Sequence, residues 1–238
     1  MVVSRVLVTR PEPGASATAR LLREMGHEPV LLPLTRIEPL AADRWPEACD
    51  AVLATSANAI RHAPQTQLRK LASTPLFVVG ERTAEAARAA GFSTIRAVAA
   101  DAASLVGLVG SEIEGHLRFL YLAGAERGHV LEDGLRELGH AVDAVATYDA
   151  PAIAYPVVAL SRMLGSERLD VALLYSSRAA VLLAQLAGRP EIAQLLAATR
   201  FLTISQEVST ALGSLGAGRA LAAATPDEEG LLALLPAA

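Results

Sequence analysis

The stretch LREMGH at residues 22–27 recurs as LRELGH at residues 135–140, an offset of 135 − 22 = 113 in a chain of 238 residues. In both copies a helical pattern of apolar residues ends at a glycine, which a histidine follows. Glycine directly after a periodic segment is typical of a helix end. The recurrence indicates that the two halves of the chain follow one structural plan.

The repetition extends to both sides of this stretch. Each further pair consists of a short apolar run that leads into a helical pattern, and the pairs are 6–10 with 119–124, 52–59 with 172–179, 77–84 with 201–208, and 97–106 with 221–232. Apolar runs of about four to six residues that alternate with helices predict βα units of a parallel sheet buried on both faces. We therefore predict an α/β fold of two similar doubly wound parallel-sheet domains joined by a two-stranded linker.

Two extended, proline-bounded segments, 33–39 and 146–151, follow the two GH sequences at equivalent positions. If they pair, the chain leaves one domain and later returns to it, whereas two consecutive domains would give the same repetition. We expect the exchanged arrangement: a first domain of residues 1–34 plus 153–238, a second domain of residues 40–147, and an interdomain bridge of residues 35–39 and 148–152.

Composition and charge restrict the class of protein. The chain is 52% hydrophobic and 19% charged, as globular proteins are, and it contains no apolar stretch of the roughly 20 residues that span a bilayer. The start of the sequence does not have the pattern of a signal peptide, so we expect a cytoplasmic protein that does not bind membranes. A net charge of −4 argues against binding to nucleic acid. With one cysteine, Cys49, the chain forms no internal disulfide.

Common cofactor and metal motifs are missing from the sequence. No G-x-G-x-x-G follows a predicted strand, and neither G-x-x-x-x-G-K-[ST] nor H-E-x-x-H occurs. The five histidines do not cluster, and His27 and His140 occupy the same turn in the two repeats, where polar residues at helix ends are common. The sequence therefore gives no motif support for nucleotide binding or for a metal site.

The predicted strands end in small hydroxyl residues that have the form of helix N-caps. These segments are Thr9–Pro11, Thr55–Asn58, Gly80–Thr83, Ser176–Arg178, Ser205–Glu207 and Thr225–Asp227. Free N–H groups at helix starts attract anions, although Ser, Thr and Asn also cap helices in proteins that bind nothing there. If these segments converge on one cleft between the domains, they predict a large ligand with several anionic groups.

Several of these segments resemble a known family. The matching residues are Val6–Pro11, Gly26–Val30, Pro33–Leu34 with Ile37, Thr55–Arg61, Val79–Gly80 with Thr83–Ala84, Ser104–Leu105, and Thr225–Pro226. In this combination and order they resemble uroporphyrinogen-III synthase over essentially the whole chain. The resemblance also implies the bridged, discontinuous two-domain fold.

The resemblance implies a lyase reaction of tetrapyrrole biosynthesis without a cofactor. Hydroxymethylbilane, a linear tetrapyrrole with eight carboxylates, would lose its terminal hydroxyl group and close to uroporphyrinogen III with ring D inverted. An azafulvene on ring A and a spiro intermediate at ring D would lie on the path. Direct closure without inversion occurs spontaneously, so the protein has to favour the spiro path by positioning its substrate.

Tyr148 is the residue that the resemblance implies as the acid that protonates the departing hydroxyl group. A packing role at the domain junction is the alternative for this side chain, and Tyr121, Tyr155 and Tyr175 match the family pattern less well. The implied substrate-binding residues are Thr9, Arg10, Ser56, Ala57, Asn58, Gly80, Gly124, Ser177, Ser205 and Thr225. Two departures from the family pattern concern this set: Ala123 stands where a polar or basic residue is common, and no proline follows Ser205.

A function of another class fits the repetition as well. A non-catalytic two-domain module that closes on a small anionic ligand would also have paired linkers and anion-binding helix starts. A nucleotide-sugar transferase is disfavoured because no phosphate loop or D-x-D metal motif is recognisable. For the synthase we expect a monomer whose partner is its small-molecule substrate, with any contact to hydroxymethylbilane synthase transient.

Overall fold

The computed structural model describes residues 3–42 and 44–236, and it divides into two compact units. Unit 1 comprises residues 1–36 and 151–238, of which 3–36 and 151–236 are described, and unit 2 comprises residues 37–150. Each unit is built on a sheet of its own with helices on both faces. The predicted α/β class with two mainly parallel sheets is confirmed.

Unit 1 contains a five-stranded parallel sheet in the order β11-β10-β9-β1-β2. Its strands are β1 (Arg5–Val8), β2 (Glu28–Leu31), β9 (Val171–Leu174), β10 (Arg200–Thr203) and β11 (Ala220–Ala222). Its helices are α1 (Gly14–Glu24), α7 (Val157–Leu164), α8 (Ser177–Leu186), α9 (Pro190–Leu195), α10 (Gln206–Ala211), the 3-10 turn η1 (Gly213–Gly216) and α11 (Glu228–Leu232).

Successive side chains along the strands of unit 1 point to opposite faces of the sheet, so its core consists of two layers. Leu7 packs in the layer beneath α7, α8, α9 and α10, whereas its neighbours Val6 and Val8 pack in the layer beneath α1 and α11. Successive strand residues point to opposite faces, so a sheet covered on both sides needs apolar residues at every position. The continuous apolar runs of the sequence follow from this requirement.

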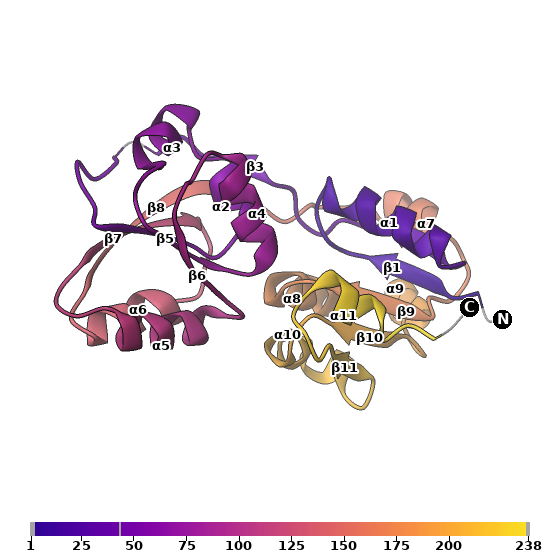
Figure 1. The fold of residues 1–238 in the computed structure, drawn as a ribbon. Helices are drawn as coiled ribbons and strands as arrows, with labels where there is room; N and C mark the ends of the chain where they lie inside the picture. Colours follow the sequence, from indigo (N-terminus) through magenta and orange to yellow (C-terminus); the bar gives the residue numbers. More distant parts are fainter. Residues whose placement is uncertain (1–2, 43, 237–238) are drawn as a thin grey trace. The chain divides into compact units, whose positions relative to one another are not determined.

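Unit 2 contains a six-stranded sheet in the order β3-β8-β7-β4-β5-β6, in which only the edge strand β3 is antiparallel. Its strands are β3 (Glu38–Pro39), β4 (Ala51–Ala54), β5 (Leu76–Val79), β6 (Ile95–Ala99), β7 (Arg118–Gly124) and β8 (Ala141–Asp149). Its helices are α2 (Ala57–Arg61), α3 (Gln65–Leu71), α4 (Glu81–Ala89), α5 (Ala102–Glu112) and α6 (Val130–Glu137). Figure 1 shows α5 and α6 together on one face of this sheet and α2 and α4 on the other.

The two sheets follow the same plan with their strands drawn from different halves of the sequence. In unit 1, β1 and β2 come from the first half and β9, β10 and β11 from the second. In unit 2, β4, β5 and β6 come from the first half, and β7 and β8 take the positions of β1 and β2. The sheet of unit 1 therefore has the strand order 2-1-3-4-5 of flavodoxin-like folds, and the parallel strands of unit 2 have the same arrangement with the chain order permuted, 5-4-1-2-3. In such sheets ligands bind where the order reverses, at the carboxyl ends of the strands.

The chain passes between the units twice, and the two passages pair with each other. Thr35 and Ala152 form an antiparallel bridge, and Arg36 donates its N–H to the carbonyl of Pro151 at 3.1 Å. Beyond this point β3 pairs with the end of β8, with Pro39 opposite Tyr148. These contacts fix the end of β8, on which the candidate acid lies.

Candidate active site

The strand order reverses between β7 and β4 in unit 2, and several of the predicted site residues meet there. Tyr148, near the end of β8, is half-buried and packs on the core layer that contains α2. Its hydroxyl donates to Oγ of Ser56 at 3.2 Å, and its ring lies 6.3 Å from the ring of His62, centre to centre. A tyrosine and a serine hydroxyl are thus adjacent at the carboxyl edge of this sheet.

Ser56 is the N-cap of α2, and its Oγ accepts the N–H of Asn58 at 3.2 Å. A serine hydroxyl has two acceptor positions and one proton to donate. The N–H of Asn58 and the hydroxyl of Tyr148 use both acceptor positions, so the proton of Ser56 is left to donate. This geometry suits an anionic or carbonyl acceptor beside Ser56, with Ala57 and Asn58 in the first turn of the helix.

Gly124 permits the close approach of Tyr148 to the main chain of β7. A Cβ atom at this glycine would lie 3.0 Å from Cζ of Tyr148, 3.1 Å from its hydroxyl oxygen and 3.3 Å from the carbonyl oxygen of Glu126. A rigid aromatic ring cannot give way by bending, so any larger residue would displace the phenol. The N–H of Ala125 also bonds the carbonyl of Tyr148 at 2.8 Å.

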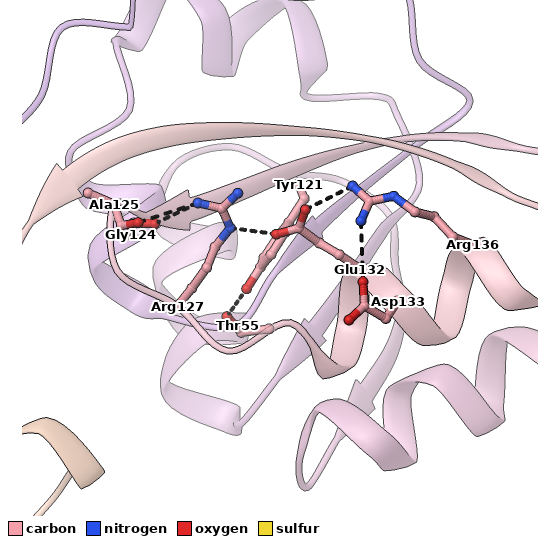
Figure 2. A network of polar contacts seen from close by, with 8 residues as sticks. All are labelled: Thr55, Tyr121, Gly124, Ala125, Arg127, Glu132, Asp133 and Arg136. Carbon is pink, nitrogen blue, oxygen red and sulfur yellow. Dashed lines mark hydrogen bonds and ion pairs between the residues drawn. The ribbon is translucent and has the colours of Figure 1, made fainter.

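A second polar network extends from β7 into α6, and Figure 2 shows its members. Arg127 donates to Glu132 at 2.6 Å, and Arg136 donates to the other carboxylate oxygen of Glu132 at 3.0 Å. The Arg127 guanidinium lies 5.9 Å from the ring centre of Tyr121, whose hydroxyl bonds Thr55 at 2.7 Å. The loop after β7 is therefore held by charge-assisted bonds.

The pKa values of the two titratable groups at the centre of this network are shifted in opposite directions. Burial raises the pKa of Tyr121, although its bond to Thr55 opposes the rise. Burial would also raise the pKa of Glu132, but the hydrogen bonds and charges of Arg127 and Arg136 outweigh it, and the pKa lies below its usual value. Tyr121 is thus kept neutral and Glu132 charged.

The corresponding edge of unit 1, between β1 and β9, contains a different arrangement. Arg10 donates to Oε1 of Glu228 at 2.9 Å, and the hydroxyls of Thr18 and Tyr175 donate to the same oxygen at 2.5 and 3.2 Å. The Arg10 guanidinium also covers the ring of Tyr175 at 4.2 Å from its centre. Burial raises the pKa of Tyr175 to about 12; its bond to Thr18 opposes the rise, and the Glu228 carboxylate adds to it. The guanidinium of Arg10 is therefore paired within the protein.

The remaining predicted residues of unit 1 lie along the same edge. The N-cap prediction is wrong for Thr9–Pro11, whereas the segment Thr225–Asp227 caps α11 through its last residue. Thr9 does not cap α1: it is fully buried, and its hydroxyl donates to the carbonyl of Leu173 in the neighbouring strand at 2.8 Å. Thr225 is exposed and does not cap α11, because Asp227 accepts the N–H of Gly230 at 2.7 Å.

The N-cap predictions that fall on Ser56, Ser176 and Ser205 are confirmed, whereas α4 begins at Gly80 without a side-chain cap. Ser176 and Ser205 cap α8 and α10, and the hydroxyl of Ser177 donates to Glu207 at 3.2 Å. In unit 2, Gly80 precedes α4 with a φ of 78°, a conformation that favours glycine. The helix starts of both units thus lie at the ends of their strands.

The repeated histidines each accept a hydrogen bond from the backbone. His27 accepts the N–H of Ser4, and His140 accepts the N–H of Leu117, each through Nδ1 and each 23 positions along the chain from its partner. Burial lowers the pKa of His140, and the charge of the nearby His116 lowers it further. Among residues 3–42 and 44–236, no three His, Cys, Asp or Glu side chains are arranged to hold a metal ion.

Sequence reasoning missed the partners that surround the predicted residues. Glu228 lies 218 positions from Arg10, and Thr55 lies 66 positions from Tyr121. Neither spacing has a local pattern that indicates contact.

Two mainly parallel sheets with helix starts and hydroxyl groups at their carboxyl edges define a class of two-unit α/β proteins, in which ligands bind at those edges. A comparison with family models finds a match over residues 16–233 to the family described as uroporphyrinogen-III synthase HemD. The chain belongs to this family.

Comparisons with solved structures show the same fold. A structure described as uroporphyrinogen-III synthetase from Helicobacter pylori aligns with a TM-score of 0.69 at 17% identity and covers 98% of both chains. A mutant uroporphyrinogen III synthase from the extremely thermophilic bacterium Thermus thermophilus aligns with a TM-score of 0.63 at 19% identity and covers 90% of both chains. A comparison with curated proteins finds no match to the sequence.

Among the residues that the structure describes, no helix is both long and apolar enough to cross a membrane.

Proposed function

We propose that this protein converts hydroxymethylbilane to uroporphyrinogen III, with inversion of ring D. The observation that carries the proposal is the family match, which extends over residues 16–233 and so includes strands of both sheets. The reaction closes the macrocycle and releases one molecule of water. It requires no change of oxidation state, so protein groups that position the substrate and supply a proton are sufficient.

Tyr148 is the proposed proton donor to the departing hydroxyl group. Its position beside Ser56, at the point where the strand order of unit 2 reverses, supports this role. A phenol stays protonated near neutral pH and donates a hydrogen bond. With a proton transferred to it the hydroxyl leaves as water, and the resulting azafulvene on ring A is open to attack by ring D. General acids of this kind typically contribute about 10²–10⁴-fold.

Binding is proposed to be distributed over many donors because the substrate carries eight carboxylates. The proton of Ser56 and the N–H groups around Ala57, Asn58 and Gly80 would serve in unit 2, with Gly124 leaving space for the phenol. Ser177, Ser205, Thr225 and Arg10 would serve in unit 1, and Thr9 would act through its backbone because its side chain is buried. Fixed donors that favour one folded conformation of the bilane would favour the spiro path over direct closure.

The proposal is tested by supplying freshly generated hydroxymethylbilane to the purified protein without metal or nucleotide. The product is oxidised, and the type I and type III uroporphyrin isomers are separated. We expect predominantly type III. Type I alone, formed at the uncatalysed rate, would reject the synthase and favour the ligand-binding module.

A further inference from the structure

The strand that carries Tyr148 contains a β-bulge directly before it. Strands β7 and β8 pair in regular register up to Ala123 opposite Ala146, but the next pair joins Gly124 to Tyr148. Thr147 is therefore the extra residue in β8. Bulges of this kind interrupt the alternation of side chains and re-aim the residue that follows.

The bulge explains how two successive residues reach the same face of the sheet. Thr147 donates its hydroxyl to the carbonyl of Ala59 in α2, and Tyr148 packs on the core layer that contains α2 and bonds Ser56 at its start. In a regular strand, neighbouring residues point to opposite faces. Without the extra residue, Tyr148 would point to the face covered by α5 and α6, away from Ser56.

The hydroxyl of Thr147 links the bulge to both neighbouring elements. This side chain is fully buried, and its Oγ1 lies 2.8 Å from the carbonyl oxygen of Ala59 and 3.4 Å from that of Ala123. Its own carbonyl accepts the N–H of Leu40 at 2.9 Å on the other side of β8. Buried polar groups left without such bonds are costly, so the hydroxyl favours the bulged register and fixes α2 against it.

We propose that Thr147 is a positioning residue for the synthase reaction: its buried hydroxyl holds the bulge that directs Tyr148 toward Ser56. The inference rests on the proposed function, in which Tyr148 is the acid. Thr147 touches no reacting atom in this mechanism. It acts by setting the direction of the phenol and the distance between β8 and the start of α2.

Thr147→Val removes the hydroxyl and keeps the branched shape, whereas Thr147→Ser keeps the hydroxyl. A misplacement of about 1 Å costs on the order of 10²-fold, so we expect Thr147→Val to lower kcat by about tenfold to a hundredfold with little change in KM. Thr147→Ser should restore most of the loss. In a Tyr148→Phe background, Thr147→Val should lower kcat no further. An equal loss in both backgrounds would overturn the inference, because Thr147 would then act without Tyr148.

Thr199→Val is the matched control. Thr199 is also fully buried, and its hydroxyl donates to the carbonyls of Leu169 and Leu195 at 2.6 and 3.5 Å in unit 1. Both valine variants should lower the melting temperature to a similar degree, but only Thr147→Val should lower kcat. If the two variants match in stability and both retain wild-type kcat, Thr147 has a structural role only.

A second readout does not depend on synthase activity. The chain has four tyrosines, so ring signals of ¹³C-labelled tyrosine can be assigned to Tyr148 by their loss in Tyr148→Phe. We expect Thr147→Val to shift the Tyr148 signal and Thr199→Val to leave it in place. An unshifted signal would overturn the inference even for an active enzyme. A shifted signal in a protein that forms only type I isomer would instead reject the proposed function and retain the bulge as the device that orients Tyr148.

Discussion

The carboxyl edges of the two sheets contain the same kinds of side chain, but these side chains have different hydrogen-bond partners. At the edge of unit 1, Arg10, Thr18 and Tyr175 all donate to one carboxylate oxygen of Glu228. At the edge of unit 2, Arg127 and Arg136 hold Glu132, and Tyr121 bonds Thr55. Unit 2 has in addition Tyr148, whose hydroxyl bonds Ser56.

The tyrosines at the two edges donate to different kinds of acceptor. Tyr175 donates to a charged carboxylate and has a pKa raised to about 12, so its proton is firmly held. Tyr148 donates to a neutral serine hydroxyl, a weaker partner than a carboxylate. One sheet therefore uses its tyrosine to hold an ion pair, while the other presents its tyrosine beside a helix start.

The largest effect on turnover is expected from removing the Tyr148 hydroxyl, which bonds Ser56 in unit 2. Tyr148→Phe removes the donor while keeping the ring, and we expect kcat to fall by about tenfold to a thousandfold with KM nearly unchanged. Tyr121→Phe is the control, since it removes a buried hydroxyl from the adjacent network and should lower stability by about 1 kcal/mol with turnover close to wild type. Steady-state kinetics on both variants decide the matter, and an unchanged kcat in Tyr148→Phe would reject this residue as the acid.

A smaller effect is expected where the phenol lies against the main chain. Gly124→Ala places a methyl group 3.0 Å from Cζ of Tyr148 and should lower kcat by about tenfold through displacement of the ring. Gly107→Ala in α5 is the control, because a Cβ there meets nothing within 4 Å. That change should stabilise the protein by about 0.5–1 kcal/mol and leave kcat unaltered. Equal kcat values in the two variants would show that turnover does not depend on the position of the Tyr148 ring.

Glu228→Gln tests the difference between the edges from the side of unit 1. If Arg10 binds a substrate carboxylate, Glu228 competes for the same guanidinium, so the neutral amide should lower KM severalfold. The lost charge-assisted bonds should also lower the free energy of unfolding by about 1–2 kcal/mol. Substrate titration at fixed enzyme concentration gives KM, and denaturant unfolding gives stability. An unchanged KM together with the stability loss would assign Arg10 to the fold alone.

The smallest expected effect concerns acid stability. The pKa of Glu132 is lower in the folded state than its ordinary value of 4.5, so its contribution to stability is present above that value and is lost as the pH falls through the folded-state pKa. Glu132→Gln should therefore remove part of the acid dependence of unfolding below about pH 4.5. Urea unfolding from about pH 6 to about pH 3 covers this range, and curves of identical slope for variant and wild type would contradict the expectation.

The sequence carried enough information for the α/β class and the paired sheets. Strands such as β4 and β9 are apolar at every position because both faces of each sheet are covered, and that pattern is local. Ser56 and Ser205 follow strands and cap helices as predicted, because capping also depends on nearby residues. Features that depend on residues close together in the sequence can therefore be predicted without a structure.

The features that the sequence did not predict depend on strand register and on contacts between residues far apart in the chain. No local signal marks Thr147 as an extra residue, because the bulge arises from how β7 and β8 pair. Glu228 meets Arg10 across 218 positions, and Thr9 turns into the sheet instead of capping α1 because the carbonyl of Leu173 accepts its hydroxyl. The direction of Tyr148, and with it the candidate site of unit 2, is decided at this level.

In the proposed mechanism the edge of unit 2, and not that of unit 1, supplies the acid. This assignment is tested by comparing Tyr148→Phe with Tyr175→Phe through the isomers that each forms from hydroxymethylbilane in a single turnover. We predict that Tyr148→Phe forms type III slowly, with type I rising as spontaneous closure competes, while Tyr175→Phe forms predominantly type III. Predominant type III at the wild-type rate from Tyr148→Phe, with the loss appearing in Tyr175→Phe instead, would contradict the assignment.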